Sequence, residues 1–217
     1  MIKLRHNRVE LALYELGDTS RGPALLLLHG LGERTPRRVP SACAAWPGRV
    51  YGLDFTGHGD SSIPHGGGYT SEILMGDVDA ALAHLGSATL LGRGLGGYVA
   101  LLAAGARPKL VAGAILSDGP GLAGGSARPG TPLIPMPDPG AVPPPDPFAL
   151  VELAADVRPP DYASSFARQA TQLSELERPI SICTLERPDW LRALLDEPGV
   201  QECEVADALA YYAQAAR

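Results

Sequence analysis

Short apolar runs bounded by turn residues alternate along the chain with segments whose apolar residues recur at helical spacing. The run at 24–29 (ALLLLH) is continuously apolar, as expected for a strand covered on both faces. Strand-like runs occupy 1–6, 9–16, 24–29, 50–54, 88–91, 113–117, 180–184 and 200–205, and helical patterns occupy 70–85, 95–106, 148–157, 162–176, 190–195 and 206–217. This alternation predicts an α/β fold with an eight-stranded, mostly parallel sheet flanked by helices.

The composition changes abruptly between Gly119 and Pro160, where twelve of the 21 prolines lie together with six glycines. Such a segment cannot form regular helix or central strand. Because strand-like runs resume at Ile180, it interrupts a sheet rather than ending a domain. We therefore expect a core in two parts, 1–118 and 179–217, separated by a small proline-rich cap insertion at 119–178.

A glycine-rich turn, LLGRGLGGYVALLAAG, joins an apolar strand to a helix at residues 90–105. Gly92, Gly94 and Gly97 fit G-x-G-x-x-G, and Asp118 follows about twenty residues later, as in a dinucleotide site. The same turn also fits G-x-S-x-G, the nucleophile turn of hydrolases, with Gly94 in place of the serine. The turn alone leaves both interpretations open.

Two further motifs favour the second interpretation. LLLLHGLGE occupies 25–33 and YGLDFTGHGDSS occupies 51–62, ahead of the glycine turn. In this order and at this spacing, the chain resembles the α/β-hydrolase superfamily along nearly its whole length. The dinucleotide interpretation explains less, because the sequence after Asp118 is proline-rich rather than a further strand–helix unit.

The resemblance implies a Ser-His-acid triad, and this sequence departs from it at each position. Gly94 stands where the nucleophile belongs and cannot form a covalent intermediate. All five histidines lie in the first 84 residues, so none falls between the last strand and the last helix, where the resemblance places the base. The acid position falls on Pro188, with Asp189 one place away, and Asp118 occupies the alternative acid position.

The sequence keeps the two backbone hydrogen-bond donors that the resemblance implies for binding an oxyanion. The backbone N–H groups of Leu31, after His29-Gly30, and of Leu95 match the two donors with which the family stabilises an oxyanion. A helix N-terminus at Leu95 would also favour a carboxylate or carbonyl oxygen. The candidate ligand-binding residues are Gly30, Leu31, Arg93, Gly94, Leu95 and Asp118.

Several functional hypotheses follow. We expect a non-hydrolytic protein that binds a small apolar, carbonyl-bearing or carboxylate-bearing ligand, or a protein partner. The alternative is a hydrolase, lyase or isomerase of unfamiliar chemistry that uses Asp118, His29 or Arg93. A partner subunit with a vestigial pocket is a third class, and dinucleotide binding through Gly92, Gly94 and Gly97 also stays open. Each residue also has a structural interpretation: His29 fixes a turn, Asp118 initiates a turn, and Arg93 pairs with a surface carboxylate.

Net charge and cysteine content limit the partners and cofactors that we expect. The net charge of −6 and the pI near 5.3 argue against nucleic acid or an anionic membrane as the main partner. Cys43, Cys183 and Cys203 are scattered among apolar neighbours and fit neither a disulfide framework nor a metal site, so we expect buried free thiols. No cofactor or metal is expected. Without an evident targeting segment, the expected location is the cytoplasm.

Overall fold

The computed structural model describes residues 1–17, 22–125 and 143–215. Its eight strands form one sheet in the order β1-β2-β4-β3-β5-β6-β7-β8. Only the β1–β2 and β2–β4 pairs are antiparallel, which confirms the mostly parallel sheet. The strands are β1 (Ile2–His6), β2 (Val9–Glu15), β3 (Leu25–Leu28), β4 (Val50–Asp54), β5 (Ala88–Arg93), β6 (Val111–Ser117), β7 (Ile180–Cys183) and β8 (Val200–Glu202).

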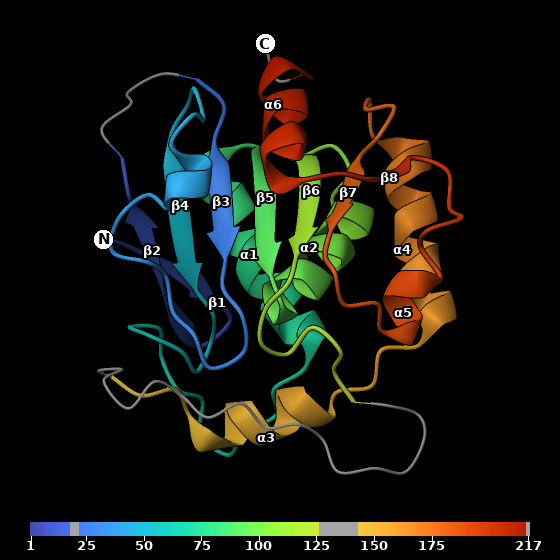
Figure 1. Ribbon diagram of the computed structural model, residues 1–217. Helices are drawn as coiled ribbons and strands as arrows, with labels where there is room; N and C mark the ends of the chain where they lie inside the picture. Colours follow the sequence, from blue (N-terminus) through green and yellow to red (C-terminus); the bar gives the residue numbers. More distant parts are fainter. Residues whose placement is uncertain (18–21, 126–142, 216–217) are drawn as a thin grey trace.

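Helices cover the sheet on both faces, as the apolar run of β3 requires (Figure 1). Leu26 and Leu28 pack in a cluster with α1 and α2, whereas Leu25 and Leu27 pack in a second cluster with α6. The helical segments are α1 (Ser71–Leu85), α2 (Leu95–Ala106), α3 (Pro147–Ala155), α4 (Pro160–Leu173), α5 (Asp189–Arg192), α6 (Val205–Ala215) and the 3-10 helix η1 (Ser41–Cys43).

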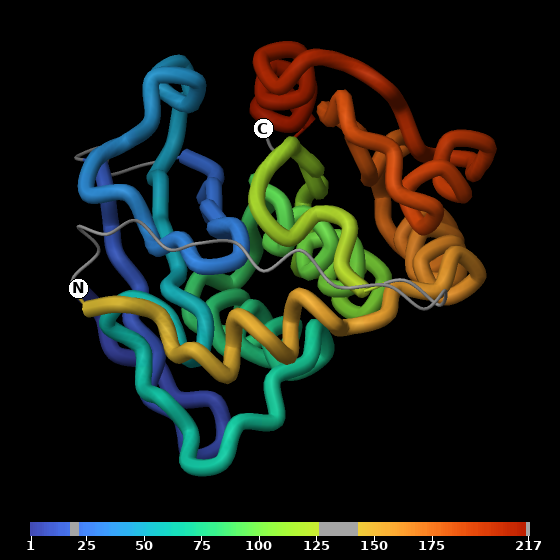
Figure 2. Tube along the Cα trace, turned by 60° about the horizontal axis from the view of Figure 1, so that its bottom comes forward, coloured from blue at the N-terminus to red at the C-terminus, as the bar shows by residue number. Residues whose placement is uncertain are grey.

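The proline-rich interval does not form one unit. Helix α3 crosses near the carboxyl ends of the strands (Figure 1 and Figure 2). Helix α4 instead packs against α2 and α5 and connects β6 to its parallel neighbour β7, so it belongs to the helical layer of the sheet. The segment 126–142 lies outside the described residues. The predicted insertion, 119–178, therefore includes a helix of the core.

The connection from β3 to β4 is unusual for a parallel pair. Residues 29–49 are all described and contain η1 but no α-helix. A parallel crossover usually places a helix on the sheet. Among the described residues, the face of the sheet that packs with α6 is covered beside that helix only by η1 and irregular chain, which leaves space next to the carboxyl ends of β3 and β5.

Candidate functional site

The glycine turn has the predicted geometry. Gly94 lies between β5 and α2 with φ +57° and ψ −118°, a conformation that residues with a side chain rarely adopt. The amide of Gly94 donates to the Ser117 carbonyl oxygen at 2.9 Å, which ties the turn to the end of β6. The strand–turn–helix arrangement predicted around Gly94 is confirmed, and the turn is sharp.

The two backbone donors inferred from the family pattern converge on one oxygen. The N–H groups of Leu31 and Leu95 donate to the carbonyl oxygen of Pro120 at 3.0 and 2.9 Å. This arrangement is the one a bound carbonyl would need. The oxygen belongs to the chain itself, so in this structure both N–H groups already donate to an acceptor within the protein.

Pro120 belongs to a segment that we call the strap, residues 118–125, which runs from β6 across the glycine turn. Two of its carbonyl oxygens accept hydrogen bonds from the side chains of Arg158 and Trp190. Arg158 donates through Nη1 to the carbonyl oxygens of Gly121, at 2.6 Å, and of Leu122. The Leu122 oxygen also accepts from Nε1 of Trp190 at 2.9 Å. Satisfied backbone groups along its length make the strap part of the packed structure.

The strap leaves no room for a side chain at the nucleophile position. A Cβ atom added to Gly94 would lie 2.1 Å from the Pro120 oxygen and 2.5 Å from the Gly119 carbonyl carbon. Gly30 and Gly121 also lie where an added Cβ would meet strap or turn atoms at 2.9 Å or less. Glycines on both sides allow the two backbones to approach this closely.

The polar candidates beside the turn are occupied by contacts within the protein. The Asp118 carboxylate accepts from the backbone N–H groups of Leu185, at 2.7 Å, and Glu186, at 3.1 Å, and so holds the turn after β7. Arg93 donates through Nε to both carboxylate oxygens of Glu33 at 3.0 Å and through Nη1 to the Asp118 carbonyl oxygen at 3.0 Å. Glu33 is thus the carboxylate with which Arg93 pairs, as in the structural interpretation of Arg93.

His29 fixes the turn after β3. Its Nδ1 donates to the Gly30 carbonyl oxygen at 2.8 Å, and its Nε2 accepts from the Phe55 N–H at 3.1 Å. These contacts specify a neutral ring, and burial lowers the His29 pKa to about 4. His58 makes the same kind of contacts. Its Nδ1 donates to the Thr56 carbonyl oxygen and its Nε2 accepts from the Gly32 N–H. Burial lowers the His58 pKa to about 3. Both nitrogens of His29 are committed, which favours the structural interpretation.

The remaining triad positions hold no catalytic geometry. The chain passes from β8 to α6 through Cys203 and Glu204 without a histidine. Pro188 precedes α5, and Asp189 pairs with Arg192 one helical turn away. The Asp189 side chain is 68% exposed. Neither residue is placed to orient a base.

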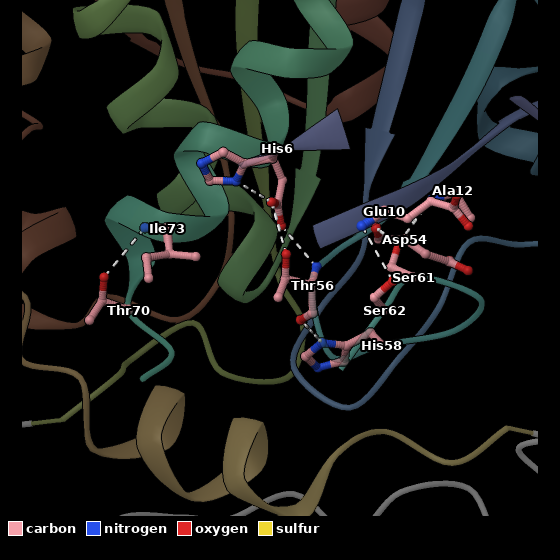
Figure 3. Close-up of polar contacts among 11 residues, drawn as sticks. His6, Glu10, Ala12, Asp54, Thr56, His58, Ser61, Ser62, Thr70 and Ile73 are labelled. Carbon is pink, nitrogen blue, oxygen red and sulfur yellow. Dashed lines mark hydrogen bonds and ion pairs between the residues drawn. The ribbon is translucent and has the colours of Figure 1, made fainter. Parts of the chain in front are cut away.

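One buried polar cluster was missed by the sequence reasoning. Asp77 of α1 accepts from the Thr56 N–H at 2.8 Å, from the Thr56 hydroxyl at 2.9 Å and from Nδ1 of His6 at 2.8 Å. Figure 3 shows His6 at the end of β1 extending toward Thr56, with His58 on the other side of that loop. This hydrogen bond to Asp77 raises the His6 pKa. The helical pattern of α1 shows that Asp77 lies in a helix. It cannot show that Asp77 contacts His6 and Thr56, because these residues are far from it in the sequence.

A cavity of about 1120 Å³ lies beside the strap, where the β3–β4 connection leaves the sheet face uncovered. Its apolar wall includes Leu27, Leu31, Leu91, Pro120 and Cys183, and its charged rim includes Arg34, Arg37, Arg93, Glu33 and Asp118. Gly94 does not line it. The cavity therefore lies next to the glycine turn, with the strap between them.

Neither a metal-binding cluster nor a membrane-spanning helix is present in the described parts of the chain. These residues contain no cluster of three or more His, Cys, Asp or Glu side chains that could hold a metal ion. None of the helices in this part of the chain combines the length and apolar character that a membrane span requires.

Solved structures share this fold at low sequence identity. The thioesterase domain from the curacin biosynthetic pathway aligns with a TM-score of 0.64 and 18% identity over 98% of this chain and 97% of that chain. A haloalkane dehalogenase from Agrobacterium tumefaciens aligns with a TM-score of 0.65 and 17% identity over 99% and 96%. A monoacylglycerol lipase from Paleococcus ferrophilus aligns with a TM-score of 0.60 and 18% identity over 95% and 99%.

At these identities the similar structures establish the fold and carry no activity to this chain. The family itself is established by a separate comparison. A model described as the alpha/beta hydrolase family matches residues 25–212, which span most of the sheet, the glycine turn and the last helix. This chain belongs to the alpha/beta hydrolase family.

Proposed function

We propose that this protein is a non-hydrolytic binding protein built on the α/β-hydrolase fold. The observation that carries the proposal is the Pro120 carbonyl oxygen, which accepts from the N–H groups of both Leu31 and Leu95. A substrate carbonyl would have to displace that oxygen to be polarised there. It would then meet Gly94, which has no nucleophile to offer.

The contacts of the other candidates do not favour an enzyme of unfamiliar chemistry. A general base needs a free lone pair within reach of the substrate. His29 uses both ring nitrogens within the turn, and the Asp118 carboxylate holds two backbone N–H groups. Dinucleotide binding is disfavoured for a related reason, because the Leu95 N–H at the start of α2 already donates to Pro120.

The ligand that the cavity fits best is an amphipathic carboxylate with an apolar chain. Its apolar wall is largely leucine, proline and cysteine, which suits an apolar chain, and its volume lies just above the range of ordinary ligand pockets. Arg37 is exposed at the rim, where a guanidinium can bind a carboxylate through two hydrogen bonds. Arg93 is available there only in competition with Glu33.

Titration with a fluorescent long-chain carboxylate, cis-parinaric acid, tests this proposal. Saturable binding to the wild-type protein is expected in the micromolar range, without hydrolysis of p-nitrophenyl esters above a denatured control. Leu91→Trp, which fills the cavity wall, is expected to abolish binding. Arg37→Ala is expected to weaken it about tenfold, whereas the adjacent exposed Arg38→Ala, outside the cavity lining, leaves it unchanged.

Two results would overturn the proposal. Saturable ester hydrolysis by the folded protein would show that the strap opens for substrate. Equal binding by wild type and Leu91→Trp would place the carboxylate elsewhere on the surface and leave the cavity without its assigned ligand.

A further inference from the structure

Two of the three cysteines, which the sequence places twenty positions apart, lie next to each other in the fold. Cys183 is the last residue of β7, and Cys203 directly follows β8. Their Sγ atoms are 4.0 Å apart. Both side chains are half-buried, so the expectation of buried thiols holds only for Cys43.

The strand register explains the approach of the two thiols. Ile182 lies opposite Glu202 in the parallel β7–β8 pair, so Cys183 lies opposite Cys203 one position further along. The Cys203 N–H donates to the Ile182 carbonyl oxygen at 3.2 Å and continues the ladder. Both side chains pack against the cluster around α6, which places them on the same face of the sheet.

This placement meets the backbone requirement of a disulfide bond. Neighbouring strands lie about 4.8 Å apart, within the range of about 4.4–6.8 Å that disulfides span between Cα atoms. Bond formation requires the two sulfurs to move from 4.0 Å apart to about 2.05 Å. Cys43 is a natural comparison, because it is 1% exposed and belongs to no such pair.

We propose that Cys183 and Cys203 form an oxidisable dithiol, a modification site that accepts a small disulfide such as oxidised glutathione. One protein thiolate attacks a sulfur of the reagent, forming a mixed disulfide and releasing one glutathione thiolate. The second protein thiolate attacks the protein sulfur of that mixed disulfide and displaces the other glutathione. Two cysteines are oxidised, one disulfide reagent is reduced to two thiols, and the two cysteine protons pass to those thiols.

The new bond would change a wall of the cavity and the edge of the sheet. Cys183 lines the cavity, as does Val205 at the start of α6. Strand β8 is only three residues long and pairs with β7 alone among the described strands. A covalent link to β7 would fix this short edge strand and the start of α6 relative to the cavity. The dithiol is independent of whether the cavity binds a carboxylate.

The test is oxidation of the full chain with glutathione disulfide, followed by acid quenching, unfolding, alkylation of the remaining thiols and peptide mass mapping. The expected product has lost two hydrogen atoms, contains one peptide pair linked through Cys183 and Cys203, and is alkylated only at Cys43. Cys203→Ser is expected to give no linked pair, and Cys43→Ser is expected to give the wild-type pair.

Three controls make the outcome decisive. Circular dichroism of each variant shows that it is folded, and protein unfolded in guanidinium shows what the same thiols do without the strand register. The proposal is overturned if Cys183 and Cys203 of the folded protein remain alkylatable under conditions that oxidise dithiothreitol. Separate glutathionylation of each cysteine without the linked pair overturns it equally.

Discussion

A Cβ atom on Gly94 would lie 2.1 Å from the carbonyl oxygen of Pro120. Contacts under 3.0 Å are essentially absent for real Cβ atoms, so the strap and a side chain at this position exclude each other. The Pro120 carbonyl oxygen that accepts from Leu31 and Leu95 therefore also fills the space that a side chain at position 94 would need.

Gly94→Ser is expected to lower stability without creating an esterase. The serine must adopt a positive φ, which costs about 1–2 kcal/mol, and must also displace the strap, which adds about 1–3 kcal/mol. Urea unfolding measures the free energy of unfolding, and p-nitrophenyl acetate measures turnover.

Gly86→Ser is the matched control for that variant. Gly86 ends α1 with φ +83° and has no atom within 4 Å of an added Cβ, so it isolates the backbone cost. Equal destabilisation by the two variants would show that the strap gives way freely. Ester turnover of about 1 per second or more in Gly94→Ser would reveal a base that these contacts do not provide.

Asp118→Ala is expected to act on stability and not on ligand binding. Without the carboxylate, the Leu185 and Glu186 N–H groups would hydrogen-bond to water instead, and the free energy of unfolding would fall by about 1 kcal/mol. Asp189→Ala removes only an exposed pair with Arg192 and should cost about half of that or less. If Asp118→Ala abolished a measurable turnover while leaving stability unchanged, the enzyme hypothesis would regain its support.

Stability is expected to fall as the pH drops from about 6.5 to about 4. Burial lowers the pKa of His29 from 6.5 to about 4, so in this window the unfolded chain binds a proton that the folded chain excludes. One pKa unit corresponds to about 1.4 kcal/mol, so His29 alone removes roughly 3 kcal/mol across the window. His58, whose pKa is lowered to about 3, acts in the same direction.

Urea unfolding at a series of pH values checks this dependence. His65→Gln is the control, since His65 is exposed in a loop and its replacement should leave the slope unchanged. A free energy of unfolding that stays constant between pH 7 and pH 4.5 would contradict the buried, neutral state of His29 and His58.

The local hydrophobic pattern was enough to predict the fold, but it could not predict that the Pro120 carbonyl oxygen lies at the two backbone donors. Alternating apolar runs predicted all eight strands, and the G-x-G-x-G spacing predicted the sharp turn at Gly94. The Pro120 contact joins backbone atoms and therefore leaves no side-chain signature. Its only trace in the sequence is Gly119 and Gly121 on either side, residues that permit close backbone approach.

Helix α4 falls inside the predicted insertion 119–178 for a different reason. The proline content of the interval 119–160 suggested a single insertion, but Pro160 lies in the first turn of α4, where proline is well tolerated. The Asp77–His6 and Cys183–Cys203 contacts depend on which strands and helices become neighbours. That information is set by the topology and not by any one segment.

Asp77→Asn is expected to destabilise the protein by about 3–5 kcal/mol. The buried carboxylate accepts from the Thr56 N–H, the Thr56 hydroxyl and His6, and an amide cannot accept all three. Asp79→Asn, two residues along the same helix, removes an exposed pair with Arg107 and should cost under about 1 kcal/mol. Equal effects of the two variants, measured by urea unfolding, would show that the Asp77 cluster contributes little.

The most direct test of the central claim is detection of scalar coupling across hydrogen bonds by nuclear magnetic resonance. A long-range HNCO experiment on protein labelled with ¹⁵N and ¹³C should show the amide nitrogens of Leu31 and Leu95 both coupled to the carbonyl carbon of Pro120, as expected from N–O distances of 3.0 and 2.9 Å. Absence of both couplings, with the two amides exchanging with solvent as fast as an unstructured peptide, would contradict the account. The two donors would then be open to a substrate oxygen.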